Sequence, residues 1–134
     1  MSDDQSTSVD TQSAQDFLKA VYALQSETER ISTNRLAEYL SITPPSVTDM
    51  AQRLHSAGLV DHRRYYGLRL TEIGEQLARK LIRQYHLIEA YLVHEFGYAL
   101  AEAHEEADQM EHAVSEKFVE ALMQRLGDRE ERSL

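Results

Sequence analysis

The stretch from Thr33 to Leu70, TNRLAEYLSITPPSVTDMAQRLHSAGLVDHRRYYGLRL, decides the fold of this chain. Its first part holds two runs with apolar residues at helical spacing, joined by the short link SIT. Thr43 is a suitable N-cap and Pro44 suits the first position of a helix, whereas Gly58 is typical of the residue that follows a helix end. The pattern predicts one helix over 33–40 and a second that begins after Thr43 and ends at Gly58.

A β-hairpin is predicted directly after these two helices. The run LVDHRRYYGLRL contains two short strand-like segments that turn near Tyr66 and Gly67. Two short helices, a tight link and a hairpin follow one another in this order in winged helix-turn-helix domains, whose second helix enters the major groove of DNA. We therefore expect a winged helix-turn-helix in which the hairpin is the wing.

The residues expected to contact DNA lie at the start of the second helix and in the wing. Side chains at the helix start are small and polar, which permits close approach to base edges. Arg53 is placed for a phosphate, and the wing arginines suit the DNA backbone or the minor groove. An ordinary solvated turn is the alternative for the wing. The candidate DNA-binding residues are Thr43, Pro45, Ser46, Thr48, Asp49, Arg53, Arg63 and Arg64.

Helices are also predicted on both sides of this segment, so the fold class is mainly α. Ser13 can cap a first helix, and Thr71 can cap a long helix that ends before Gly97. Two shorter helices should follow, over about 100–112 and 115–126. The expected divisions are a disordered acidic tail at 1–12, a winged helix-turn-helix domain at 13–76, a second, helical domain at 77–127 and a tail at 128–134.

Charge is distributed unevenly along the chain, whose net charge is −9. Residues 30–85 carry nine Lys and Arg against five acids, whereas the segments before and after them are acidic. A basic centre within an acidic chain favours an anionic partner for that segment, such as double-stranded DNA.

The composition excludes several classes of protein. The chain has no cysteine, which excludes disulfides, zinc–thiolate sites and thiol catalysis. No stretch approaches the roughly 20 apolar residues that span a bilayer, so we expect no membrane partner. The N-terminus lacks the basic and apolar segments of a secretory signal, and we expect a cytoplasmic protein.

The run HEEADQMEH, which begins at His104, concentrates groups that bind metals. On a continuous helix, several of them would lie within an arc of roughly 100° beside an apolar stripe. Carboxylates held partly buried beside one another repel unless a cation joins them, which favours a metal site. The alternative is a solvated acidic helix, and Glu105 and Glu106 are expected in water. The side chains on the arc are His104, Asp108, Glu111 and His112.

Further ligands would have to come from other helices, because one helix seldom completes a coordination sphere. Asp16 on the first helix and Glu89 on the long helix are candidates. Ser13 and Asp16 also match a capping box, in which the acid would accept from backbone N–H groups instead.

Several stretches together carry a resemblance to a known family. They are QDFLKAVYAL, ISTNRLAEYLSITPPSVTDM, GLRLTEIGEQLARKL, HLIEAYLVHEFGY and HEEADQMEHAVSEKFVEALMQRLG. The chain resembles the iron- and manganese-dependent repressors of the diphtheria toxin repressor family, and it is most similar to their manganese transport regulator branch. The similarity covers about Ser13 to Gly127.

The resemblance implies a homodimer that binds a palindromic operator when loaded with metal and represses metal-uptake genes. It implies metal ligation by Asp16, Asp108, Glu111 and His112, with Glu89 and His104 at a neighbouring second site. It also implies base contacts from the small residues at the start of the recognition helix. We expect no enzymatic activity, because no general acid or base remains to serve a substrate.

The ligand types favour manganese. Iron-sensing relatives use sulfur at the positions of Asp16 and Asp108, whereas this chain has carboxylates at both. Hard oxygen ligands with one or two imidazoles suit Mn²⁺, with Fe²⁺ as the second choice.

The expected dimer seam comprises apolar residues of the last two helices, such as Phe118, Leu122 and Leu126.

Two positions differ from the family pattern. Relatives usually carry a histidine four residues before Glu89, where this chain has Tyr85, and a one-residue step turns His86 away from that position by about 100°. Some relatives have a carboxylate at the position of Lys19. These differences favour the alternative function, a metal-independent winged-helix transcription factor with a degenerate metal site.

Overall fold

The computed structural model describes residues 12–133, with side-chain surroundings up to residue 126. The chain divides into two compact units, and the boundary falls between Lys80 and Leu81. The described part is mainly helical with a single two-stranded sheet, which confirms the predicted fold class. None of the described helices has the length and apolar character needed to cross a membrane.

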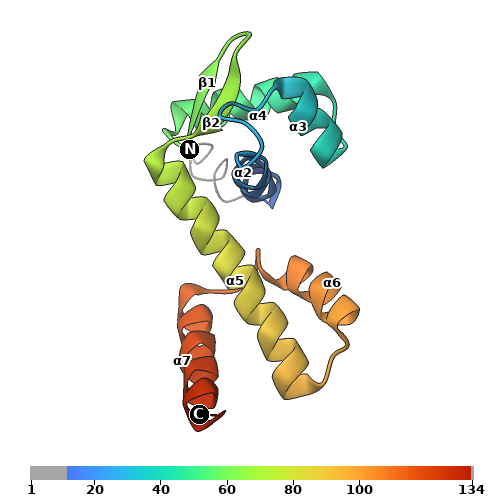
Figure 1. Ribbon diagram of the computed structural model, residues 1–134, viewed down its shortest axis with the longest axis vertical. Coiled ribbons are helices and arrows are strands. Elements are labelled where there is room, and N and C mark those ends of the chain that lie inside the picture. Colours follow the sequence, from blue (N-terminus) through green and yellow to red (C-terminus); the bar gives the residue numbers. More distant parts are fainter. Residues whose placement is uncertain (1–11, 134) are drawn as a thin grey trace, which may run out of the picture. The chain divides into compact units, whose positions relative to one another are not determined.

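The first unit is a winged helix-turn-helix, as predicted (Figure 1). Helices α3 and α4 are packed together, and the hairpin follows α4 in the chain and in space. Helix α3 has the predicted bounds, and Thr43 is the N-cap of α4, with Pro44 in its first turn. The elements are α2 (Gln12–Leu24), α3 (Thr33–Leu40), α4 (Pro44–Ser56), β1 (Val60–Arg63), β2 (Gly67–Leu70) and the start of α5 (Glu72–Phe96).

The expectation for Ser13 was wrong, because α2 already begins at Gln12 and contains Ser13 in its first turn. The predicted tail at 1–12 otherwise lies outside the described residues.

One apolar core joins the elements of the first unit. Each fully buried aliphatic or aromatic side chain contributes about 1.5–3 kcal/mol relative to an exposed one. Helix α2 therefore packs firmly on α3, α4 and the hairpin, and Asp16 of α2 is held on the same body as the recognition helix. The largest fully buried side chains of this core are Phe17, Leu18, Val21, Ile31, Leu36, Val47, Leu54, Val60 and Leu68.

The wing is fixed to the segment that precedes α3. Ile31 and Leu68 form a two-way backbone bridge, with N···O distances of 2.8 and 2.9 Å. Gly67 has a φ of +89°, and a Cβ atom placed there would lie 2.4 Å from the carbonyl oxygen of Ile31. Only glycine permits this close approach.

The first turn of α5 lies directly against the end of the helix-turn-helix. A Cβ atom at Gly74 would lie 1.9 Å from the carbonyl oxygen of Leu59, so no side chain fits there. Thr71 is the predicted cap: its Oγ1 accepts from the N–H of Gly74 at 3.1 Å and donates to the carbonyl of Gly58 at 2.7 Å.

The second unit contains the rest of α5, α6 (Leu100–Met110) and α7 (Glu116–Ser133). The first of the two predicted short helices ends earlier than expected, at Met110, and the second continues past Leu126 to Ser133. Leu122 is only 3% exposed inside the core of this unit, so it is not available to a dimer seam. That core consists of Ile88, Leu92, Ala103, Ala107 and Leu122, flanked by partly buried aromatics.

Candidate metal centre and nucleic-acid interface

The start of α4 is built to present small side chains. Oγ1 of Thr43 accepts from the backbone N–H of Ser46 at 3.3 Å and lies 2.9 Å from the Ser46 hydroxyl. Thr43, Pro45 and Ser46 are all exposed, and Thr48 is half-buried. The helix start therefore offers hydroxyls and a pyrrolidine ring to an incoming surface without a bulky side chain in the way.

Asp49 and Arg53 form an ion pair on the exposed face of α4. Their charged atoms are 3.4 Å apart, and the two side chains are 70% and 48% exposed. Exposed i,i+4 pairs contribute only a few tenths of a kcal/mol. Arg53 can therefore exchange this partner for another anion at little cost.

A pocket of about 400 Å³ within the first unit is lined by residues of both α2 and the recognition helix α4. Asp16 is the only α2 carboxylate among its lining residues, and α4 contributes its ion pair to the same pocket. The structure thus brings a predicted metal ligand and three predicted DNA-binding residues to one cavity. The lining residues are Ser13, Asp16, Phe17, Leu40, Ile42, Ser46, Asp49, Met50 and Arg53.

The wing carries its arginines at the tip. Arg63 ends β1 and Arg64 begins the turn, and both are exposed. The turn closes through a hydrogen bond from the N–H of Tyr66 to the carbonyl of Arg63 at 3.0 Å. The guanidinium of Arg64 lies over the ring of Tyr65, 5.1 Å from its centre. The exposed positive charge expected of the wing is present.

The base of the wing is held by Arg30. Its guanidinium donates to the carbonyls of Asp61 and Gly67, each at 3.2 Å, and to the Asp61 carboxylate at 2.5 Å. The hydrogen bond from Arg30 lowers the pKa of Asp61 below its ordinary value, against the opposing effect of desolvation. One side chain thus connects both strands.

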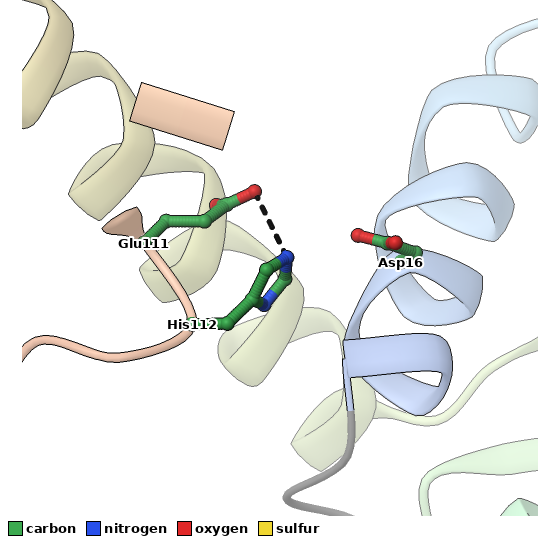
Figure 2. Close-up of side chains that lie close together, drawn as sticks. All are labelled: Asp16, Glu111 and His112. Atoms are coloured by element: carbon green, nitrogen blue, oxygen red, sulfur yellow. Dashed lines mark ion pairs between the residues drawn. The ribbon is translucent and has the colours of Figure 1, made fainter. Parts of the chain in front are cut away.

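Glu111 and His112 form a buried polar pair in the second unit. Glu111 is 3% exposed and His112 is half-buried. Nε2 of His112 lies 3.4 Å from Oε1 of Glu111, and Figure 2 draws this pair together with Asp16 from α2. A carboxylate is buried only where a cation or hydrogen bonds compensate for lost hydration, so the donor set fits a divalent metal.

The helix predicted over 100–112 is two residues too long. Helix α6 ends at Met110, and Glu111 is its C-cap, with helical dihedral angles and an N–H that donates to the carbonyl of Ala107 at 2.9 Å. His112 lies in the turn that follows. Ala103 and Ala107 are buried and Met110 partly so, as expected for the apolar stripe. Asp108 is exposed rather than partly buried, because the small alanines fill the buried face of α6.

Glu89 of α5 and His104 of α6 contact each other directly. Oε2 of Glu89 is paired with Nδ1 of His104, and Oε1 lies 3.7 Å from Nδ1 of His86. His86 therefore reaches Glu89, although it was expected to turn away from this site. The i,i+3 spacing of His86 and Glu89, adjacent on a helix surface, could have indicated this pairing.

Tyr85 packs beside the pair. Its ring packs edge-on against His86 and His104, with ring centres 5.4 and 5.3 Å apart, and its hydroxyl donates to the carbonyl of His104 at 3.4 Å. Desolvation, followed by the negative charges of Glu89, Asp108 and Glu111, raises the pKa of Tyr85 to about 12. A neutral phenol thus stands where relatives are expected to have an imidazole.

Both units match one protein family. Residues 11–68 match the family described as "Iron dependent repressor, N-terminal DNA binding domain", and residues 71–133 match "Iron dependent repressor, metal binding and dimerisation domain". The chain belongs to the iron-dependent repressor family. Its similarity to the diphtheria toxin repressors and manganese transport regulators is thereby confirmed, and members of this family are DNA-binding transcriptional regulators rather than enzymes.

Individual iron-dependent repressor relatives cover different shares of this chain. An uncharacterised HTH-type transcriptional regulator of Methanocaldococcus jannaschii is 39% identical over 84% of this chain and 90% of its own length. The regulator MntR of Lysinibacillus sphaericus is 35% identical over 61% of this chain and 59% of its own. The structure of the manganese regulator SloR matches with a TM-score of 0.72 and 38% identity, over 85% of this chain and 53% of SloR. The chain thus spans little more than half the length of the last two relatives.

Proposed function

We propose that this iron-dependent repressor homologue is a Mn²⁺-dependent transcriptional repressor, with Fe²⁺ as the alternative metal. It would act as a homodimer that binds a palindromic DNA operator and represses metal-uptake genes in the cytoplasm. One observation carries the proposal: a winged helix-turn-helix and a buried carboxylate–imidazole pair, Glu111 and His112, occur in the same chain.

The donor set supports manganese. Asp16, Glu111 and His112 offer two carboxylates and one imidazole, and Asp108 adds a third carboxylate after a change of its exposed side chain. A site with oxygen donors and no sulfur has a weaker preference for metals late in the Irving–Williams series, such as Cu²⁺ and Zn²⁺, and suits Mn²⁺. The likeness to SloR, a manganese regulator, agrees with this choice.

A second ion would use Glu89 and His104. These side chains already contact each other, and His86 is close enough to join them. Tyr85 contributes no charged ligand near neutral pH, since the pKa of its phenol is raised to about 12. The second site is therefore poorer in donors than the first.

The proposed switch depends on which unit supplies each ligand. Asp16 belongs to the body that carries α4 and the wing, whereas Glu111 and His112 belong to the helical unit. When bound, the ion supplies the positive charge that these carboxylates would share. Sharing one ion would fix the spacing of the two recognition helices of a dimer, so that they meet successive major grooves one helical turn apart. Without it, carboxylate repulsion would lower the fraction of competent dimers and the operator affinity in proportion.

On DNA, the residues of α4 and the wing would divide the work. Thr43, Pro45 and Ser46 would approach base edges, with Thr48 and Asp49 further along the helix. Arg53, Arg63 and Arg64 would contact phosphates or the groove walls. Asp49 suits a cytosine amino group, because a carboxylate accepts from that donor.

Operator binding across a series of divalent metals tests the function. A bound operator is first selected from random duplexes in the presence of Mn²⁺, and its affinity is then measured with Mn²⁺, Fe²⁺, Mg²⁺ and Zn²⁺ and with EDTA. We expect tight binding with Mn²⁺ or Fe²⁺ and loss of binding with EDTA. Equal affinity with metal and with EDTA would instead favour the alternative, a metal-independent winged-helix transcription factor.

A further inference from the structure

The tip of the wing exposes two tyrosines that do not pack in the hydrophobic core. Tyr65 is 88% exposed and Tyr66 is 74% exposed, the largest exposed fractions among the large apolar and aromatic side chains described. Burying an aromatic ring against a partner is favourable, and tyrosine is enriched where a surface meets a partner. The tip therefore has the composition of a contact surface.

The backbone of the tip is strained at one of these tyrosines. Tyr65 has a φ of +71°, in the left-handed region that bulky residues rarely adopt. Such outliers persist where the surrounding structure enforces them, and they concentrate at functional sites. Glycine would be easier at this turn position, so the aromatic ring is retained against a conformational cost.

The hairpin that carries this turn is held at its base. Arg30 binds the carbonyls of Asp61 and Gly67 on opposite strands, and the bridge between Ile31 and Leu68 anchors the hairpin to the segment before α3. Bracing reduces the ordering cost of binding, because the contact surface is already in place. The Tyr65 ring is presented on a fixed hairpin.

The charges around the tip fit an anionic partner. Arg63 and Arg64 are exposed there, in a chain whose net charge is −9. The guanidinium of Arg64 stacks over the Tyr65 ring, so cation and ring point outward as one unit. A positively charged tip is attracted to phosphates, whereas the acidic segments of the chain are repelled by them.

Building on the proposed function, we propose that the wing tip enters the DNA minor groove beside each operator half-site and prefers an A·T-rich flank there. Arg64 lies in the groove, and the Tyr65 ring packs on the sugars of its wall. A·T tracts narrow the minor groove and deepen its negative potential, which attracts inserted arginines. The wing thereby extends the recognised sequence beyond the base pairs that α4 contacts.

The test uses the full chain in Mn²⁺ and the selected operator in two versions. They differ only in the base pairs next to the half-sites, which are an A·T run in one and mixed G·C pairs in the other. We compare wild type with Tyr65→Gly, Arg64→Ala and Tyr39→Ala. Tyr39 is a matched control, because it carries a similar arginine stack, with Arg35 5.9 Å from its ring centre, away from the wing.

We expect wild type and Tyr39→Ala to prefer the A·T flank. Tyr65→Gly should lose this preference and bind the A·T version roughly tenfold more weakly, because the ring no longer packs on the sugars, and it should leave the salt dependence unchanged. Arg64→Ala should also lose the preference, and it should reduce the slope of log affinity against log salt by about 1. Glycine tolerates the positive φ at position 65, so the thermal midpoint of Tyr65→Gly should be equal or higher.

The outcomes separate this inference from the proposed function. If wild type binds no duplex in any metal, the repressor function fails and the wing inference fails with it. If wild type binds the operator in Mn²⁺ but Tyr65→Gly keeps both its affinity and its flank preference, only the wing inference is overturned. An unchanged DNA profile together with lost self-association of Tyr65→Gly would assign the tip to a protein contact instead.

Discussion

The guanidinium of Arg30 lies 2.5 Å from the carboxylate of Asp61 and, in the same position, donates to backbone carbonyls on both strands of the wing. Arg30 precedes α3 and Asp61 lies in β1, so this ion pair joins the helix-turn-helix to the hairpin. The orientation of the wing therefore depends on this ion pair together with the backbone bridge between Ile31 and Leu68.

Asp61→Asn should destabilise the first unit at neutral pH. The pKa of Asp61 is lowered by its bond to Arg30, so the stabilisation is present above the ordinary aspartate value of 3.8 and is lost as the pH falls through the lower folded value. Thermal midpoints measured between pH 2 and pH 7 should show a difference from wild type that is largest at pH 7. A difference that stays constant at low pH would contradict this linkage.

Gly67→Ala should lower the stability by about 1–3 kcal/mol or more, since strain from a positive φ adds to a steric clash. Gly58→Ala is a matched control: Gly58 has a φ of +80°, but a Cβ atom there meets no other atom within 4 Å. Urea unfolding of both variants separates strain from clash. If both variants lost the same free energy of unfolding, the contact between Ile31 and Gly67 would not exclude a side chain at position 67.

Glu111→Gln should weaken Mn²⁺ binding by more than the roughly 10–100-fold loss that follows removal of an outer-shell partner, because it removes a ligand charge. Glu105→Gln is the control, because this substitution also removes one negative charge, at a residue that is exposed on the preceding helix. Calorimetric titration with Mn²⁺ measures both affinities. Equal affinities in the two variants would mean that Glu111 is not a ligand.

Alkaline pH should destabilise the second unit through Tyr85. The pKa of this phenol is raised from 10.0 to about 12, so between these values the unfolded chain loses a proton that the folded chain retains. Stability should fall as the pH rises from 10 to 12, and the fall should be smaller in Tyr85→Phe. The readouts are denaturant unfolding at fixed pH values and the absorbance of the phenolate.

Much of the first unit was predictable because local signals coincide with the observed boundaries. Thr43 with Pro44 marks the start of α4, and Thr71 marks the start of α5, since each hydroxyl accepts from a backbone N–H that the helix leaves unpaired. The basic segment and the element order then indicated DNA binding without any knowledge of packing.

The candidate metal site was only partly predictable. The residue types around Glu111 were identified, but no glycine or proline marks the end of α6 at Met110, so the periodic pattern was extended two residues too far. The pairing of Tyr85 and His86 with Glu89 and His104 depends on how α5 packs against α6. Helical periodicity alone carries no information about that contact.

The absence of a side chain at Gly74 restricts which substitutions this position can accept during evolution. A methyl group there would collide with the carbonyl of Leu59, a backbone atom that cannot rotate away. Substitution would have to be accompanied by a displacement of the whole first turn of α5. Homologues should therefore keep glycine at the position aligned with Gly74, even where their metal ligands and wing residues differ. This glycine can then be used to align distant members of the family.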